Sequence, residues 1–227
     1  MTLFIREILP SLMVSDASVI PNFTIESEQD VLAIARGNIL YIYQIGNIQV
    51  SSPVFYEFNN PIKFVRPIYS ESSTNSNILI IFANFDACIL GPKGESLLNF
   101  SLISSEDIFN PMYIKCALHP SLIAIQISPH HIDIYLKTEN CILNYATSIS
   151  IGCKTITDFC FIGPTTKVMQ LAVLTEEFNE SPKLQIIEIN PDWTTREDPQ
   201  KSVQLSSDSY LLFPIHPEQL STVVVLN

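Results

Sequence analysis

The stretch NILIIFANFDACIL at residues 77–90 decides how this chain folds. It contains two short apolar runs, 78–83 and 87–90, separated by Asn84, Phe85 and Asp86. Successive residues of a strand point to opposite faces, and in the first run both faces are apolar. A strand with one face in water would alternate apolar with polar side chains. The stretch therefore predicts a β-hairpin that is buried on both faces.

The same pair of apolar runs recurs along the chain. It returns at 30–45, 121–136 and 168–189, and 220–227 holds the first half of a fifth copy. Successive copies start 47, 44, 46 and 52 residues apart, counted from Val31, Ile78, Leu122, Val168 and Leu220. A period of this size, built from β-branched and aromatic residues with turn residues between them, is typical of propeller blades.

Further strand candidates flank each hairpin, so that each period holds four strands. Innermost-strand candidates precede the hairpins at 18–25, 61–68, 111–118, 155–162 and 209–215. Outer-strand candidates follow the complete hairpins at 53–58, 96–103, 142–151 and 201–205. The segment that comes nearest to a helical period, 27–37, is interpreted as strand because it falls inside the repeat.

These features predict an all-β chain that forms a β-propeller of four-stranded, WD-like blades. Residues 1–15 are predicted to be a leading segment, and residues 16–208 to form four blades. The blades are placed at 16–58, 61–103, 111–150 and 155–206. Residues 209–227 are predicted to be a partial fifth blade, truncated before its hairpin is complete.

The charge balance argues against nucleic acid as a direct partner. The chain has 12 Lys and Arg against 23 Asp and Glu, a net charge of −11. Proteins that bind nucleic acid neutralise phosphates with clustered basic side chains, and no window of this sequence has such a cluster. Apolar residues make up 47% and charged residues 15%, which predicts a packed chain rather than a disordered one.

No membrane or secretory segment is predicted. The apolar runs are far shorter than the roughly 18 to 20 residues that a membrane helix needs. Arg6 and Glu7 stand where a signal peptide would need its apolar stretch. We therefore expect a nuclear or cytoplasmic protein, in which the glycosylation sequons at Asn22, Asn99 and Asn179 stay unmodified.

The cysteines predict neither disulfides nor a zinc site. No Cys-x-x-Cys pair is formed by the five, which are Cys88, Cys116, Cys141, Cys153 and Cys160. In an intracellular protein, irregularly spaced cysteines are typical of buried thiols that pack as small apolar residues. Cys116 and His119 have the spacing of a metal-ligand pair, but no second pair accompanies them, so a strand cysteine and a turn histidine are expected.

The remaining candidates for chemistry are a histidine pair and one aspartate. His130, His131 and Asp133 are dense enough to suggest a metal, but adjacent strand residues point to opposite faces, which favours a solvated turn. Asp158 lies in an innermost-strand candidate, with no equivalent seen in the neighbouring blades to complete the carboxylate pair of a hydrolase. No nucleophile motif or phosphate-binding loop is present. We therefore predict no catalytic residue, cofactor or metal.

Three segments carry a resemblance to a known family. They are NFTIESEQDVLAIARGNILYIYQI (22–45), FANFDACIL (82–90) and ITDFCFIG (156–163), the last followed by MQLAVL and LQIIEI. In this order they resemble the first propeller of the large damage-specific DNA-binding protein subunit. Relatives of that subunit are the large subunit of the cleavage and polyadenylation specificity factor and a propeller scaffold of the spliceosome.

The resemblance implies a scaffold, not an enzyme. Such proteins have three seven-bladed propellers, and this chain would cover about four and a half blades of the first. The family's first propeller suggests docking of substrate receptors in a cullin-RING ubiquitin ligase linked to DNA repair. The alternative is a scaffold in pre-mRNA 3′-end cleavage or splicing. A propeller enzyme or ligand-binding module is a third class, ranked below both.

The expected partners are other proteins, such as substrate receptors or subunits of the same complex. A propeller closes by covering each blade with its neighbour, and the truncated fifth blade would leave one side open. The uncharged segment 223–226 at this open edge predicts self-association or aggregation of the isolated chain.

Overall fold

The structure is a computed structural model, which describes 13–23, 30–45, 52–69, 76–102, 115–138, 143–162, 169–198, 201–215 and 222–226. In these ranges the chain forms strands and no α-helix, which confirms the all-β class. No helix that could cross a membrane occurs in this part of the chain. Residues 1–12, Cys141 and the repeat starts Val168 and Leu220 lie outside the described residues.

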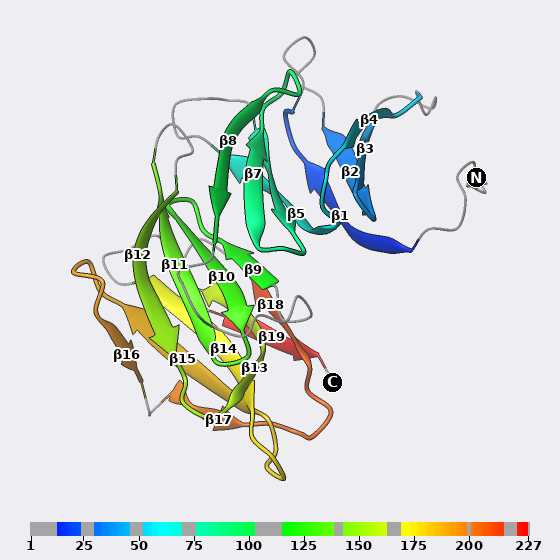
Figure 1. Cartoon of the computed structure of the whole chain (residues 1–227). Coiled ribbons are helices and arrows are strands. Elements are labelled where there is room, and N and C mark those ends of the chain that lie inside the picture. Colours follow the sequence, from blue (N-terminus) through cyan, green and yellow to red (C-terminus); the bar gives the residue numbers. More distant parts are fainter. Residues whose placement is uncertain are drawn as a thin grey trace. The chain divides into compact units, whose positions relative to one another are not determined.

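The chain divides into two compact units, Met1–Ser104 and Ser105–Asn227. The first unit contains two sheets in which each strand pairs with the next along the chain (Figure 1). Sheet A consists of β1 (Val14–Ile20), β2 (Val31–Arg36), β3 (Ile39–Gln44) and β4 (Val54–Glu57). Sheet B consists of β5 (Ile62–Tyr69), β6 (Ser76–Phe82), β7 (Asp86–Leu90) and β8 (Ser96–Ser101).

The second unit contains three more antiparallel sheets. Sheet C consists of β9 (Lys115–Leu118), β10 (Leu122–Ser128), β11 (His131–Lys137) and β12 (Leu143–Ser150). Sheet D consists of β13 (Thr155–Ile162), β14 (Met169–Glu176), β15 (Lys183–Ile189), β16 (Thr195–Glu197) and β17 (Val203–Gln204). Sheet E pairs β18 (Leu211–Ile215) with β19 (Thr222–Leu226).

The hairpin at 77–90 is confirmed as β6 and β7, buried on both faces. Ile78 to Ile81 have no exposed surface, so consecutive residues on opposite faces are equally covered. The turn between the strands is closed by the Phe85 N–H, which donates to the Phe82 carbonyl at 3.1 Å. Phe85 takes a left-handed φ of 64° while its side chain stays buried, so this turn packs as part of the core.

Two of the predicted strand positions are corrected by the structure. The first strand was expected at 18–25, but β1 ends at Ile20, because Pro21 cannot donate to a ladder and Asn22 turns the chain at φ 49°. This strand begins at Val14, before the predicted start of the first blade. The outer strand expected at 201–205 is only the two-residue β17, and β16 shares that edge of β15 with it.

Within the first unit, sheets A and B pack face to face over a shared core. Their first strands, β1 and β5, lie in contact. Sheet A contributes small and branched residues such as Val31, Ala33 and Leu40, and sheet B contributes Ile78 and Ile80. All five are fully buried, so the side of sheet A that faces sheet B excludes water.

Within the second unit the same packing occurs twice. Sheets C and D share a core that includes Leu122, Ile134 and Leu171. Sheets D and E share another, in which Leu174 of β14 lies with Leu212 of β18. The first strands are again in contact, β9 with β13 and β13 with β18. Neighbouring sheets within each unit therefore pack in the same way, with their first strands in contact, and have the same strand order.

Candidate functional site

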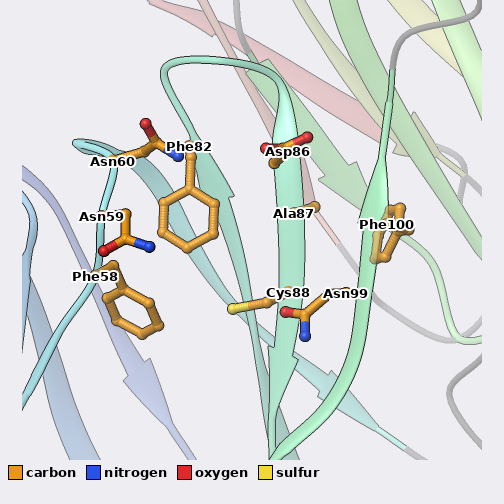
Figure 2. Close-up of a pocket in the computed structure, with 9 residues that line it drawn as sticks. All are labelled: Phe58, Asn59, Asn60, Phe82, Asp86, Ala87, Cys88, Asn99 and Phe100. Atoms are coloured by element: carbon orange, nitrogen blue, oxygen red, sulfur yellow. The ribbon is translucent and has the colours of Figure 1, made fainter.

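A pocket of about 430 Å³ lies between sheets A and B (Figure 2). It is found beside the end of β4, the start of β7 and the end of β8. It draws on three separate segments of the first unit. Its lining residues are Phe58, Asn59, Asn60, Phe82, Asp86, Ala87, Cys88, Asn99 and Phe100. The pocket thus combines aromatic rings with amide groups and one carboxylate.

The loop after β4 is held in place by both sheets. Phe58 exchanges two hydrogen bonds with Asn38, because its N–H donates to the Asn38 carbonyl and its own carbonyl accepts from the Asn38 side chain, both at 2.9 Å. At the other end of the loop, the Pro61 carbonyl accepts the Ala83 N–H at 2.8 Å. The pocket wall that contains Asn59 and Asn60 is therefore anchored on each side.

The floor of the pocket is apolar. The Phe58 and Phe82 rings lie 5.2 Å apart at a tilt of 53°, and the Cys88 sulfur points toward them (Figure 2). Burial raises the pKa of the Cys88 thiol to about 12, so at neutral pH it is a neutral thiol. A thiol in that state is neither a nucleophile nor a metal ligand, and Cys88 acts here as an apolar surface.

The rim of the pocket is polar, and only some of its polar groups make hydrogen bonds within the protein. Asn99 accepts from the Ser96 hydroxyl at 3.1 Å, and one Asp86 oxygen accepts from the Asn84 amide at 2.5 Å. In the part of the chain that the structure describes, the Asn59 and Asn60 side chains make no hydrogen bond. The rim therefore offers free amide donors and acceptors, together with the second oxygen of Asp86.

The structure does not assemble the histidine pair into a metal site. His130 lies in the turn before β11 with its Nδ1 atom 2.6 Å from the Lys154 carbonyl, and His131 Nδ1 lies 3.1 Å from the Ser128 hydroxyl. Asp133 is buried within β11. No group of three potential ligands that could hold a metal ion is found among the described residues.

The Cys116 and His119 pair is also part of the packing. Cys116 is half-buried in β9. The His119 ring lies 5.3 Å from the Phe161 ring, and its Nδ1 atom is 3.2 Å from the Ser121 hydroxyl. These are the neighbours of a histidine that closes a turn, as the sequence predicts.

Asp158 joins two sheets of the second unit. Its carboxylate accepts the backbone N–H of Leu212 in β18 at 2.7 Å and lies 3.6 Å from the Lys115 ammonium. The residue before it, Thr157, donates its hydroxyl to the Leu174 carbonyl in the neighbouring strand. The Asp158 carboxylate is therefore engaged in holding the first strand of sheet E.

Sequence reasoning missed that Asp158 has an equivalent, Asp16, in sheet A. The Asp16 carboxylate accepts the Val65 N–H of β5 at 2.8 Å and pairs with Arg66 at 2.7 Å. Ser15 before it donates to the Ala35 carbonyl, as Thr157 does in sheet D. Both aspartates follow a β-bulge in the first strand of their sheet. The shared Ser/Thr-Asp dipeptide in a first strand was the available signal.

No protein family and no curated protein matches this chain.

Proposed function

We propose that this chain is part of a β-propeller scaffold that binds other proteins. Sheets A to D are its blades, and sheet E is the next sheet of the series. The observation that carries the proposal is a link that occurs twice, between sheets A and B and between sheets D and E, in which an aspartate of one first strand accepts the first-strand N–H of the next sheet. A repeat of packing as well as of sequence supports stacked blades rather than unrelated sheets.

The edge strands of the sheets support the binding role. The last strand of each of sheets A to D has exposed apolar side chains. They are Val54 and Phe55 in β4, Leu97 in β8, Tyr145 in β12 and Val203 in β17. Single exposed apolar residues are common on protein surfaces, but their recurrence on the edge strands favours a surface that partners cover.

The sequence resemblance narrows the proposed assembly. It favours the receptor-docking propeller of a cullin-RING ubiquitin ligase adaptor linked to DNA repair, with nuclear or cytoplasmic partners. A scaffold in pre-mRNA 3′-end cleavage or splicing is the second candidate, because the same segments resemble that branch of the family.

Co-purification with quantitative mass spectrometry tests the proposal. Receptor-type propeller proteins or a cullin recovered with the tagged protein would support the first assembly, and 3′-end cleavage or splicing subunits would support the second. Phe55→Glu should deplete the recovered subunits, whereas Phe178→Glu, in the exposed β14–β15 loop, should not. A protein that recovers no partner and instead carries a stoichiometric small molecule or metal in native mass spectrometry would refute the scaffold.

A further inference from the structure

We propose that the pocket of Figure 2 binds an arginine side chain presented by an extended, basic segment of a partner protein. The inference rests on the proposed function, because it names the kind of segment that this scaffold would hold.

The apolar floor suits the stem and the flat face of an arginine. A volume of about 430 Å³ falls in the range of ligand pockets and accommodates one long side chain. The Phe58 ring is only partly buried and packs against the buried Phe82 ring, so it offers an aromatic surface against which a guanidinium stacks favourably. The same sheet already has such a pair, because the Arg66 guanidinium carbon lies 3.8 Å from the centre of the Phe64 ring.

The polar rim matches the donors of a guanidinium. Arginine presents five N–H donors in one plane and no acceptor. Asp86 offers a carboxylate oxygen, and the Asn59, Asn60 and Asn99 amides offer carbonyl oxygens at other points of the lining. Lysine has a compact ammonium with three donors, which cannot reach as many separated acceptors at once. The arrangement therefore favours arginine over lysine.

Charge complementarity points in the same direction. Of the nine lining residues, Asp86 is the one that carries a charge at neutral pH, and none is basic. The whole chain has a net charge of −11. The Asp86 carboxylate and the negative net charge of the chain both attract a basic segment and repel an acidic one.

The edge of sheet B indicates that the ligand is an extended segment. Asn99 and Phe100 line the pocket from β8, which pairs only with β7 among the described residues. A peptide that added to the free edge of β8 would turn every second side chain toward one face of the sheet. One of those side chains would enter the pocket while the backbone pairs with β8.

Binding of a matched pair of peptides to the full 227-residue chain tests the inference. One probe is a capped pentapeptide with a central arginine flanked by leucine and glycine. The other has citrulline in place of arginine, which keeps the shape and removes the charge. With the chain immobilised at low density on a biosensor, the arginine peptide should bind at least tenfold more tightly. Equal binding of the two peptides would overturn the inference without depending on any variant.

Two variants then locate the binding. Asp86→Asn should remove most of the preference for arginine, whereas Glu180→Gln, which removes one exposed carboxylate elsewhere, should leave it unchanged. Asn59→Ala should weaken binding of the arginine peptide severalfold. Methylguanidinium binding as tightly as the peptide would reject the extended-segment part, because β8 would then contribute nothing.

The pocket and the scaffold can fail separately. If the peptides do not discriminate but the tagged protein still co-purifies with other subunits, only the arginine pocket is rejected. If the peptides discriminate but the tagged protein recovers no partner and instead carries a stoichiometric small molecule or metal, the proposed scaffold is rejected and the pocket stands as a site for basic peptides.

Discussion

Phe82 contributes to two features at once, the core of the first unit and the floor of its pocket. Its side chain is 7% exposed and its ring lies against that of Phe58. Removing the ring would leave a cavity under the pocket as well as losing buried apolar surface.

We predict that Phe82→Ala lowers the free energy of unfolding by about 3 to 5 kcal/mol, the cost of deleting a buried aromatic side chain. Urea denaturation followed by tryptophan or far-ultraviolet signals measures it. Phe178→Ala is the matched control, because that ring is 90% exposed and its removal should change the midpoint very little. A Phe82→Ala midpoint as close to wild type as that of the control would contradict the buried placement.

The thiols should differ sharply in reactivity. Burial raises the pKa of Cys88 and Cys160 from the ordinary 9.0 to about 12, whereas Cys153 is exposed. We predict that iodoacetamide at pH 8.5 modifies Cys153 in the native chain and leaves Cys88 and Cys160 unmodified until urea is added. Peptide mass spectrometry identifies the modified sites. Modification of Cys88 at the rate of Cys153 would show that Cys88 is accessible to solvent rather than buried.

The same pKa shifts give a direction for stability. The folded chain holds the Cys88 and Cys160 protons more tightly than the unfolded chain, since both pKa values are raised. Their contribution to stability is therefore complete below about pH 9 and is lost as the pH rises toward 12.

At the scale of elements, the β7–β8 turn is tied to sheet A by an aromatic side chain. Gly94 in this turn has a φ of 78°, and the Tyr56 hydroxyl from β4 lies where a side chain at this position would begin. Gly152 has a similar φ of 69°, but nothing lies within 4 Å of the equivalent position. A side chain at Gly152 would therefore introduce backbone strain alone, whereas one at Gly94 would introduce backbone strain and a clash with Tyr56.

We predict that Gly152→Ala costs about 1 to 2 kcal/mol of stability, the penalty for a side chain in the left-handed region. Gly94→Ala should cost more, by a further 1 to 3 kcal/mol or so, because the methyl group also displaces Tyr56. Thermal unfolding of both variants gives the comparison. Equal losses would mean that Tyr56 moves aside freely and does not tie the sheets together.

The order of strands was predictable because β6, β10 and β14 are nearly continuous apolar runs with turn residues on either side. The strand at 155–162 was placed correctly to the residue. β16 could not be found, because Thr195, Arg196 and Glu197 are exposed and have no apolar alternation. Their pairing depends on the free edge of β15, which is a property of the folded sheet.

The pocket was not predictable, since its lining comes from three segments, 58–60, 82–88 and 99–100, that are separated in the sequence. Asparagine at Asn59 and Asn60 signals a loop, and Phe82 and Cys88 signal a core. These loop and core residues line one pocket only because sheet A packs on sheet B. The proposed arginine site therefore depends on tertiary structure rather than on a motif.

At the scale of the whole molecule, sheet E differs from its predecessors. Among the described residues it has two strands, and Tyr210 just before β18 and Leu226 at the end of β19 are exposed. An exposed apolar edge is a template for pairing with another chain.

We predict that the 227-residue chain expressed alone self-associates, and that light scattering reports a mass above that of the 25.5 kDa monomer. Leu226→Lys should reduce the scattering by placing a charge at the edge, and Phe178→Lys should not, although it also removes an exposed apolar side chain. A monodisperse monomer with a cooperative melt would rule out the open edge as a source of association.

The direction of the aspartate links has a consequence for synthesis of the protein. Asp16 and Asp158 each belong to one sheet and receive an N–H from a sheet that comes later in the chain, at Val65 and Leu212. As the chain leaves the ribosome, each sheet is complete, with its acceptor in position, before the next first strand emerges. Addition of that strand then closes only a short loop. We therefore expect that, during translation, the first strand of sheet B docks on a sheet A that is already folded, and the first strand of sheet E on an already folded sheet D.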